Sequence, residues 1–387
     1  MDFDLIIVGA GLVGASLATG LAGSGLRLAL VDPEPAPTTP QSDWDSRVYA
    51  ISPGSRDFLA ASGAWARIPA QRLMPVDSML VRGDARDAAL VFSAYDAGLE
   101  ALCFIVESRA IESALRAELM ARDDVTVFCP SRPASLDFGQ NSARLVLLDG
   151  RSLEAKLIVG ADGAQSWVRQ ETGIEAHDRE YRQHAVVANF EVQCAHSAVA
   201  RQWFRCDGVL ALLPLPGNRV SMVWSTWDAA AERLLALNVQ DLENEVGVAC
   251  GHELGTMHLL NEPLAFPLRL TRVAELIKPR LALIGDAAHS IHPLAGQGVN
   301  LGFQDARELA QVLRGRKGQD DCGDWRLLRR YARARKETIA AMQITTDVLQ
   351  RLFNNQTPGL RWLRNTGLNV ADRVAPLKKL LVERALG

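Results

Sequence analysis

Three glycines near the start of the chain have the spacing of a turn that holds the pyrophosphate of a dinucleotide. Gly9, Gly11 and Gly14 follow an apolar run at residues 5–8 and open a helical pattern at residues 12–24. In such a turn the first glycine allows the sharp bend, the second lets the backbone approach the phosphates, and the third allows close packing of helix on strand. The amino terminus of the helix offers partial positive charge to the pyrophosphate. We therefore predict a βαβ unit that binds a dinucleotide.

Acidic residues end three apolar runs that we predict to be buried parallel strands. Asp32 ends a run at residues 26–31, and Asp162 and Asp286 follow two much later runs. Parallel strands open onto the ligand crevice at their carboxyl ends, where carboxylates can accept hydrogen bonds from hydroxyl groups. A single NAD-binding fold would be complete within about the first 150 residues. The two later carboxylates favour FAD, because its ribityl chain adds hydroxyl groups that NAD lacks.

A glycine-rich loop follows the third of these strands. Gly296 and Gly298 flank Gln297 immediately before a predicted helix, so backbone N–H groups there can face an electron-rich ring or an anion. A reduced flavin is negative near N1, and a helix amino terminus would stabilise that charge. His289 and His292 precede the loop, and we interpret them as residues that shape the loop or that support the residues in contact with the cofactor. No carboxylate or cysteine set accompanies them, so we predict no metal site.

The overall composition is typical of a globular enzyme, with 48% hydrophobic and 22% charged residues. A net charge of −3 argues against nucleic acid as the main partner, because phosphate binding needs a basic surface. The six cysteines have no close spacing and indicate free thiols in a reducing compartment. No apolar run reaches the length of a spanning helix, and no leader pattern precedes the first strand, so we expect a cytoplasmic protein.

Periodicity along the rest of the chain indicates three structural parts. Strand patterns fill residues 185–192, 208–213 and 220–224, and helical patterns fill most of the chain from 325 to 386. We predict an α/β fold with an α+β insert: an FAD-binding Rossmann-like domain of the glutathione-reductase type, an inserted antiparallel sheet that binds substrate, and a helical carboxyl-terminal region. Further expected elements are helices at residues 53–64, 108–122, 241–250 and 304–313 and a hairpin at residues 143–148 that returns from residue 153. The expected domains are residues 1–75, 100–178 and 277–330 for FAD, 76–99 and 179–276 for substrate, and 331–387 for the helical region.

Taken together, the motifs resemble those of the class A FAD-dependent monooxygenases, which have the p-hydroxybenzoate hydroxylase-like fold. Within that group they are most similar to the ubiquinone-biosynthesis aromatic-ring hydroxylases. The resemblance covers essentially the whole chain. Besides the three glycine and aspartate motifs, it is carried by residues 45–52, 211–216, 289–305, 363–368 and 376–379. The sequence departs from the family pattern at Gln165, Gln304 and the pair Gln193-Cys194, none of which removes an expected cofactor contact.

The resemblance implies roles for individual residues. Asp286 would bind the ribityl O3′, while Arg47 would lie beside the pyrophosphate and Arg109 would also contact the cofactor. Asp162 and Gly163 would serve both FAD and the pyridine nucleotide. The full set of expected cofactor contacts is Gly9, Gly11, Leu12, Val13, Gly14, Asp32, Arg47, Arg109, Asp162, Gly163, Gly285, Asp286, Gly298, Val299 and Asn300. The expected flavin-loop environment of the reaction is Pro293, Gly296, Gln297 and Gly298.

The activity that the resemblance implies is hydroxylation of the aromatic ring of a polyprenylated phenol in ubiquinone biosynthesis. NADH or NADPH would reduce FAD, O2 would form a C4a-hydroperoxide, and the ring would attack it; no protein acid or base is assigned. Two alternatives stay open. One is another flavin reaction on the same fold, such as hydroxylation of a small aromatic or reduction of a prenyl chain. The other is a non-catalytic flavin-binding scaffold of a quinone-biosynthesis complex.

The carboxyl-terminal region is basic, with 16 Lys and Arg against 7 Asp and Glu from residue 314 onward. Its first part is an amphipathic pattern containing Arg326, Arg329, Arg330, Arg333 and Arg335. One interpretation is peripheral contact with an anionic membrane or with partner proteins of quinone biosynthesis. The other is a solvated face packed on the catalytic domain.

Two interpretations are open for the aromatic residues of the inserted sheet. Trp203, Phe204, Trp224 and Trp227 could line a substrate pocket, but packing in the core of the sheet is favoured for each.

Overall fold

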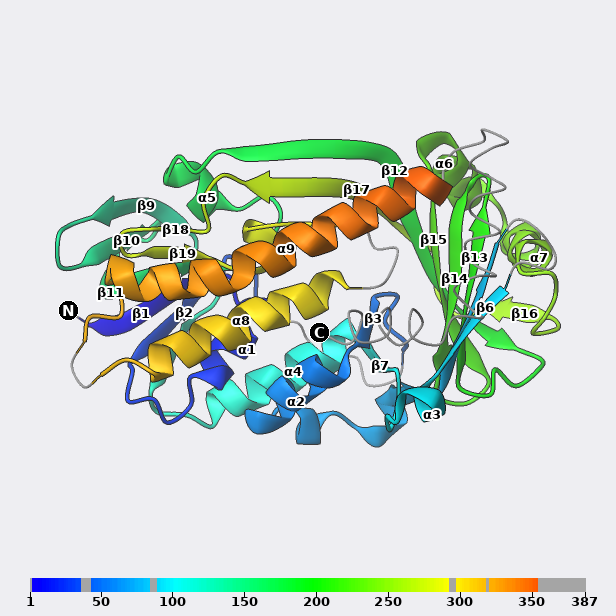
Figure 1. Cartoon of the computed structure of the whole chain (residues 1–387), viewed down its shortest axis with the longest axis horizontal. Coiled ribbons are helices and arrows are strands. Elements are labelled where there is room, and N and C mark those ends of the chain that lie inside the picture. Colours follow the sequence, from blue (N-terminus) through cyan, green and yellow to red (C-terminus); the bar gives the residue numbers. More distant parts are fainter. Residues whose placement is uncertain (1, 36–42, 84–88, 292–296, 318–319, 354–387) are drawn as a thin grey trace.

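The computed structural model describes residues 2–35, 43–83, 89–291, 297–317 and 320–353, with side chains to residue 348 in the last helix. Two large sheets lie at opposite ends of an elongated molecule, and a small three-stranded sheet lies between them (Figure 1). One large sheet contains the predicted parallel strands and the other contains the predicted antiparallel strands.

The first large sheet has a parallel core in the order β19-β11-β1-β2-β8. Side chains alternate across it. Leu5 and Ile7 pack toward α1, α4 and α8, whereas Ile6 and Val8 pack toward the β9–β10 hairpin. Its strands are fully buried in the centre, which explains their continuous apolar sequences. The strands are β1 Phe3–Val8, β2 Leu28–Val31, β8 Val125–Phe128, β9 Pro133–Phe138, β10 Ala143–Leu147, β11 Ser152–Gly160, β18 Ile277–Lys278 and β19 Leu281–Leu283.

Helices cover one face of this sheet (Figure 1). They are α1 Leu12–Gly20, α4 Ser108–Met120 and α8 Gly298–Arg314, with α2 Pro53–Ala61 beside them, while α5 Trp167–Glu171 lies toward the hairpin. The Ser52 side chain accepts a hydrogen bond from the backbone N–H of Ser55 and so caps α2. Gly63 has φ +86°, which suits the residue just beyond a helix end.

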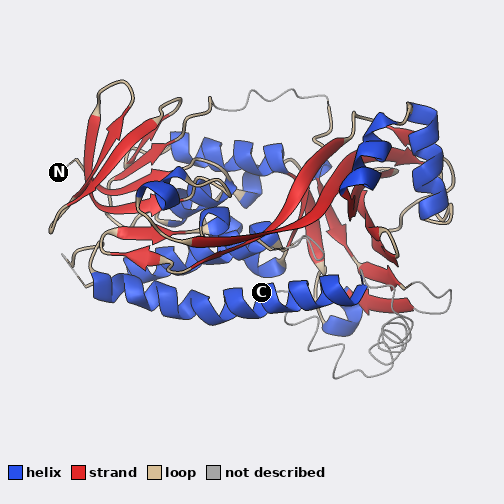
Figure 2. Ribbon diagram, turned by 90° about the horizontal axis from the view of Figure 1, so that it is seen from above, coloured by secondary structure: helices blue, strands red, loops and turns tan. Residues whose placement is uncertain are grey.

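The second large sheet has the order β16-β12-β15-β14-β13-β5-β6, with β17 also paired to β12. Its strands are β5 Ser78–Arg82, β6 Ala89–Ser93, β12 Ala176–Val192, β13 Val199–Arg205, β14 Gly208–Leu215, β15 Arg219–Trp227, β16 Met257–Leu259 and β17 Leu264–Val273. Helices α6 Asp228–Ala236 and α7 Val239–Ala249 pack on one of its faces. The small sheet, β3 Val48–Ile51, β7 Cys103–Glu107 and β4 Leu73–Val76, packs against the other face. The long paired strands β12 and β17 run through the middle of the molecule and link its two ends (Figure 2).

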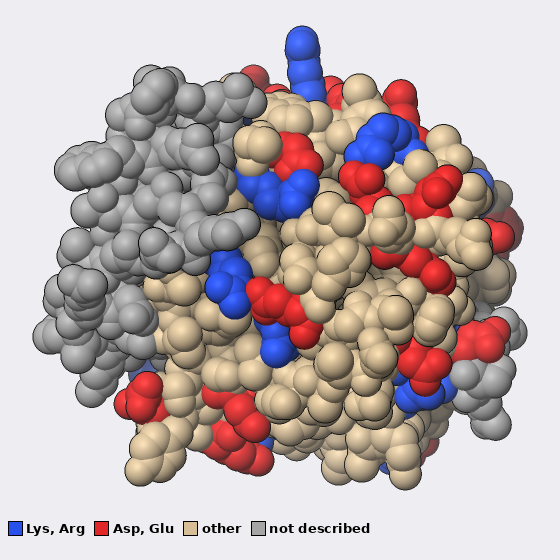
Figure 3. Space-filling model, turned by 90° about the vertical axis from the view of Figure 1, so that its right-hand side faces the viewer, with Lys and Arg blue, Asp and Glu red and all other residues tan. Residues whose placement is uncertain are grey.

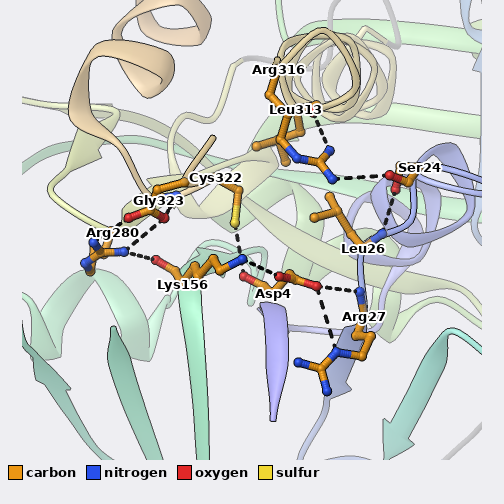
Figure 4. Close-up of polar contacts among 11 residues, drawn as sticks. Asp4, Ser24, Leu26, Arg27, Lys156, Arg280, Leu313, Arg316, Cys322 and Gly323 are labelled. Carbon is orange, nitrogen blue, oxygen red and sulfur yellow. Dashed lines mark hydrogen bonds and ion pairs between the residues drawn. The ribbon is translucent and has the colours of Figure 1, made fainter. Parts of the chain in front are cut away.

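The last described helix, α9 Trp325–Phe353, crosses the molecule in front of α8 (Figure 1). Its connection to α8 is fixed at the amino ends of the parallel strands (Figure 4). The Cys322 thiol donates to the Asp4 carbonyl at 3.2 Å, and Lys156 Nζ lies 2.8 Å from the Asp4 carboxylate. Arg280 pairs with Asp321 at 2.6 Å. No helix in the described ranges is both long and apolar enough to cross a membrane.

Most predicted elements are present, but several boundaries were wrong. The return arm from residue 153 and the apolar run before Asp162, which we predicted as a separate strand, form one strand, β11, because its first half pairs with β10 and its second half with β1. Helix α1 ends at Gly20 instead of residue 24, before glycines at positive φ. Helix α8 begins at Gly298 instead of 304, and α6 was not predicted. The predicted helix over 325–386 is described only to Phe353.

Candidate FAD site

The glycine turn has the geometry that its sequence predicts. Gly9 has φ +106°, and a Cβ there would lie 2.3 Å from the Ala161 carbonyl oxygen. A Cβ on Gly14 would lie 2.0 Å from the Gly9 carbonyl oxygen, so the turn and α1 tolerate only glycine at both positions. In front of Gly11, by contrast, a Cβ would meet nothing within 4 Å. The open space therefore lies at the amino terminus of α1, where a pyrophosphate would bind.

The next two residues of the motif are packing residues. Leu12 is buried and begins α1. A Cβ on Gly285 would lie 3.2 Å from Val13 Cγ1, and one on Gly302 would lie 2.6 Å from Val13 Cγ2. Val13 therefore fills the contact between α1, the Gly285 turn and α8, and it holds these three parts of the site side by side.

A cavity of about 420 Å³ opens beside the glycine turn. Ala10, Gly11, Asp32, Arg109 and Glu112 are among the residues that line it. The Asp32 carboxylate accepts hydrogen bonds from Ala10 N at 2.6 Å and from Glu34 N at 2.9 Å. A carboxylate has about four lone-pair positions, so acceptor capacity is left for ribose hydroxyls. The cavity and the Asp32 carboxylate that lines it fit the adenosine end of FAD.

Asp45 brings the two predicted arginines together across 62 positions of sequence. One carboxylate oxygen of Asp45 accepts from Arg47 N at 3.0 Å, and the other lies 3.2 Å from Arg109 N and 3.4 Å from Arg109 Nε. The Arg47 guanidinium lies 4.5 Å from the centre of the Phe266 ring. Asp45 thus holds both arginines near one another, and Arg109 lines the cavity, where it can neutralise phosphate charge.

Two further residues hold the Asp45 segment, and the sequence analysis missed both. Glu107 accepts from Asp45 N at 2.6 Å and pairs with Arg72 at 3.1 Å. Asn189 on β12 donates its Nδ2 to the Asp45 carbonyl at 2.8 Å. Glu107 follows the apolar run of β7, which is the same signal that identified Asp32 and Asp286. Asn189 is distant in sequence and no local pattern indicated it.

Asp162 differs from the other strand-ending carboxylates. Its oxygens accept from Ser166 Oγ at 2.5 Å and from Val168 N at 2.9 Å, so the carboxylate faces the amino terminus of α5. Burial raises the pKa of Asp162 despite these hydrogen bonds. We expected this carboxylate to face the ligand crevice, but its strongest contacts are within its own loop. Gly163 follows at φ +79°.

The Gly285 turn is held from below by a buried ionic cluster. The Asp305 carboxylate is fully buried and accepts from Gly285 N at 2.9 Å. It lies 2.6 Å from His289 Nε2 and 2.6 Å from Arg335 Nε. Burial opposes ionisation, but His289 and Arg335 outweigh it and lower the pKa of Asp305. Arg335, which we placed in a basic helical pattern, is 5% exposed and belongs to this cluster instead; His289 shapes the loop as predicted.

Asp286 has the surroundings of a ligand-binding carboxylate. Its side chain is accessible to water although protein surrounds it, as for a residue that lines a deep recess. Burial raises its pKa, with a smaller opposing effect of His289 and a reinforcing effect of Asp305. No hydrogen bond to the Asp286 carboxylate is present among the residues that the structure describes. Such a carboxylate fits a ligand that brings its own donors, as the ribityl hydroxyls would.

The flavin-loop residues fall into two groups. Pro293 and Gly296 lie outside the described residues, as does His292. Gln297 precedes α8, and a Cβ on Gly298 would meet nothing within 4 Å, so the amino terminus of α8 opens onto free space. Val299 packs on the core. The Asn300 side chain accepts from Ser52 N at 2.9 Å and donates to the Ala50 carbonyl at 2.8 Å, so it joins α8 to β3.

Two of the three tryptophans singled out in the second sheet are packing residues. Trp203 and Trp224 lie in the core under α6 and α7, and Trp227 is 40% exposed. Phe204 lies on the opposite face of β13 from Trp203. All six cysteines are free, and no group of three metal-ligating side chains exists in the described parts of the chain.

Comparison with known proteins agrees with this geometry. Residues 2–346 match the model of a family described as an FAD binding domain. The chain is 36% identical to 3-demethoxyubiquinol 3-hydroxylase of Escherichia coli, over 99% of this chain and 98% of that protein. It is 32% identical to ubiquinone hydroxylase UbiL of Rhodospirillum rubrum, over 99% and 89% of the two chains. It is also 32% identical to human ubiquinone biosynthesis monooxygenase COQ6, over 98% and 92%.

Solved structures show the same fold at lower sequence identity. p-Nitrophenol 4-monooxygenase PnpA from Pseudomonas putida has a TM-score of 0.79 at 16% identity, over 99% of this chain and 98% of that one. Klebsiella pneumoniae HpxO, solved with FAD and uric acid, has a TM-score of 0.77 at 18% identity, over 98% and 97%. The predicted p-hydroxybenzoate hydroxylase-like fold is thereby confirmed. The chain belongs to this FAD-binding family, and it is an FAD-dependent monooxygenase related to the ubiquinone-biosynthesis hydroxylases.

Proposed function

We propose that this protein hydroxylates the aromatic ring of a polyprenylated phenol in ubiquinone biosynthesis, with FAD as cofactor and with NADH or NADPH and O2 as co-substrates. The observation that carries the proposal is the similarity to ubiquinone hydroxylases over nearly the full length of both chains. The FAD site supports the cofactor part of the proposal, because Asp32 and Asp286 offer acceptors and Arg109 offers a cation beside the glycine turn. Bound FAD would supply the chemistry of oxygen activation and transfer.

The residues of this chain would bind and orient the cofactor. The backbone at Gly11 and the amino terminus of α1 would hold the pyrophosphate, and Arg47 and Arg109 would offset its charge. Asp32 would accept from ribose hydroxyls and Asp286 from ribityl hydroxyls. The amino terminus of α8 would stabilise negative charge on the reduced flavin ring. We also propose the cofactor contacts at Gly163, Gly285 and Val299 and the flavin-loop roles of Pro293, Gly296 and Gln297.

We propose that the substrate ring lies between the amino terminus of α8 and the face of the second sheet that is turned away from α6 and α7. That face carries Gln202 and Phe204. We also propose that residues 76–99 and 179–276 form the substrate domain, which contains this sheet. We further propose a cytoplasmic location with peripheral contact to the inner face of the membrane, or to quinone-biosynthesis proteins, through the basic carboxyl-terminal region, because a polyprenylated substrate is almost insoluble in water.

The outer end of the substrate domain offers little to an anionic surface. Figure 3 shows basic and acidic side chains interspersed over the part of this end that is not grey. This domain also contains ion pairs such as Arg82–Glu253 and Arg233–Glu245. Interspersed charge gives a weak net field, so the basic region of α9 is the better candidate for such contact.

Complementation tests the proposal. Strains blocked at each ring-hydroxylation step of ubiquinone biosynthesis would receive this gene, and the quinone intermediates would be identified by mass spectrometry. We expect one strain to regain ubiquinone and the Asp286→Ala variant to fail in that strain. Rescue of no strain by a well-expressed, flavin-loaded protein would refute the proposed substrate. Turnover of a phenol without a prenyl tail, at equal kcat/KM, would favour a small aromatic substrate.

A further inference from the structure

A second cavity, separate from the FAD site, lies between α9 and the end of β17. Its volume is about 470 Å³, and residues 272–277 form one wall while one side of α9 forms the other. Its floor includes His289 and Gln343, which are 2% and 4% exposed. None of the residues that line it lines the cavity beside the glycine turn.

Four cations surround this cavity. Arg272 comes from β17, and Arg329, Arg333 and Lys336 come from successive turns of α9. All four side chains are exposed, and none of these side chains forms an ion pair or a hydrogen bond within the part of the chain that the structure describes, although the Arg272 backbone pairs with β12 and with His289. Glu275 is the one carboxylate among the lining residues. The wall of the cavity therefore carries a positive charge that the described protein does not neutralise.

The three cations on α9 repel one another and destabilise the helix when no anion is bound. Arg329 and Arg333 are four residues apart, and Arg333 and Lys336 are three apart, so like charges are neighbours on one face. Fixed contacts keep that face toward the cavity. The Gln343 amide donates to the Thr271 carbonyl at 2.8 Å, the Tyr331 hydroxyl donates to the Leu283 carbonyl at 2.8 Å, and Arg335 is bound to Asp305.

We propose that this cavity is a binding site for a phosphate-bearing ligand. Guanidinium groups bind phosphate through paired hydrogen bonds, and three arginines and a lysine around one cavity can contact two phosphate groups. The apolar side chains of Val273, Leu276 and Ile339 between them would receive an uncharged part of the same ligand. A phosphate of this kind could come from a soluble pyridine dinucleotide or from the headgroup of an anionic phospholipid.

The carboxyl-terminal segment is a poor competitor for this site. Residues 354–387 contain six Lys and Arg and two Asp and Glu. Like charge therefore opposes their binding among four cations, which favours an external anion as the occupant.

Binding to the full-length, FAD-loaded protein tests the inference without any measurement of activity. Inorganic pyrophosphate, NADH and NADPH would be titrated by calorimetry. Vesicles of phosphatidylcholine, with and without phosphatidylglycerol, would be tested by sedimentation. The test variant is Arg329→Gln/Arg333→Gln, and the matched control is Arg326→Gln/Arg330→Gln, which removes the same charge from the same helix outside the cavity lining.

We expect the wild-type protein to bind pyrophosphate, and the test variant to bind it roughly tenfold more weakly because two charge-assisted contacts are lost. The control variant should change this affinity less than about twofold. A dinucleotide source predicts that NADH or NADPH competes with pyrophosphate. A lipid source predicts that the test variant sediments less with phosphatidylglycerol vesicles than the control variant does. The inference is overturned if none of these probes binds, or if both variants lose affinity equally.

Discussion

The buried cluster at Asp305 allows one prediction to be worked out in detail, with the substitution Asp305→Asn. The Asp305 carboxylate is fully buried and accepts from Gly285 N, His289 Nε2 and Arg335 Nε at 2.9, 2.6 and 2.6 Å. Asparagine keeps the shape but removes the charge, and it turns one acceptor into a donor. Arg335, only 5% exposed, would then be a buried cation without its counter-ion.

Removing one partner of a buried ion pair typically costs about 3–5 kcal/mol of folding free energy. That is a large share of the roughly 5–15 kcal/mol that stabilises a typical protein. We therefore expect urea unfolding of the FAD-free protein at neutral pH to show a much lower midpoint for Asp305→Asn. The slope of the transition should stay the same if the unfolded state is unchanged.

The matched control is Asp149→Asn. Asp149 lies 2.6 Å from Arg151, the same separation as in the Asp305–Arg335 pair, but its side chain is 48% exposed. Solvent screens such a pair, so its loss should leave the midpoint almost unchanged. Equal urea midpoints for the two variants would refute the reasoning. We expect the burial of an ion pair, and not its length, to determine how much folding free energy is lost when one partner is removed.

Three further predictions concern the cofactor site and its acid dependence. Gly14→Ala should lower the unfolding temperature of the FAD-free protein, because its Cβ would lie 2.0 Å from the Gly9 carbonyl oxygen. Gly11→Ala should fold normally but bind FAD at least about tenfold more weakly, as measured by flavin titration. Equal unfolding temperatures for the two variants would contradict the account. Asp45→Asn should weaken FAD binding by loosening Arg47 and Arg109, and flavin titration that matches the wild type would contradict it. FAD affinity should fall on acidification at a pH above the ordinary range of aspartate, about 3.9, because burial raises the pKa of Asp286 and FAD needs its ionised form; the step should vanish in Asp286→Asn. Asp305 has a lowered pKa, so its contribution to folding stability is present above its unfolded pKa and is lost as pH falls through its folded pKa.

The parts of the fold that were predictable are those with local signals. Buried parallel strands show as apolar runs, and the glycine turn needs residues that have no Cβ, so both are visible in the sequence. The position of a side chain relative to distant segments is not visible in this way. Asp162 carries the same signal as Asp286, yet free donors at the start of α5 hold its carboxylate within its own loop. The signal therefore located the strand end but did not show these hydrogen bonds within the loop.

Long-range pairing explains the remaining misses. Arg335 belongs to the same basic sequence pattern as the exposed arginines of α9. It is a core residue only because it pairs with Asp305, which lies 30 positions earlier in the sequence. The role of Asp45 likewise depends on Arg109 and Asn189, which approach it only after the sheets are assembled. Trp203 and Trp224 followed the simpler expectation, because large apolar side chains on one face of a sheet are usually covered by helices.

The central claim is that this protein uses FAD to place one oxygen atom on a polyprenylated phenol. The most direct measurement is mass spectrometry of the product formed by the FAD-loaded protein with NADH or NADPH and ¹⁸O2. The account predicts a product that is heavier by one ¹⁸O atom, formed by the wild type and not by Asp286→Ala. Oxidation of the pyridine nucleotide with no labelled product, for every polyprenylated phenol of the pathway, would contradict it.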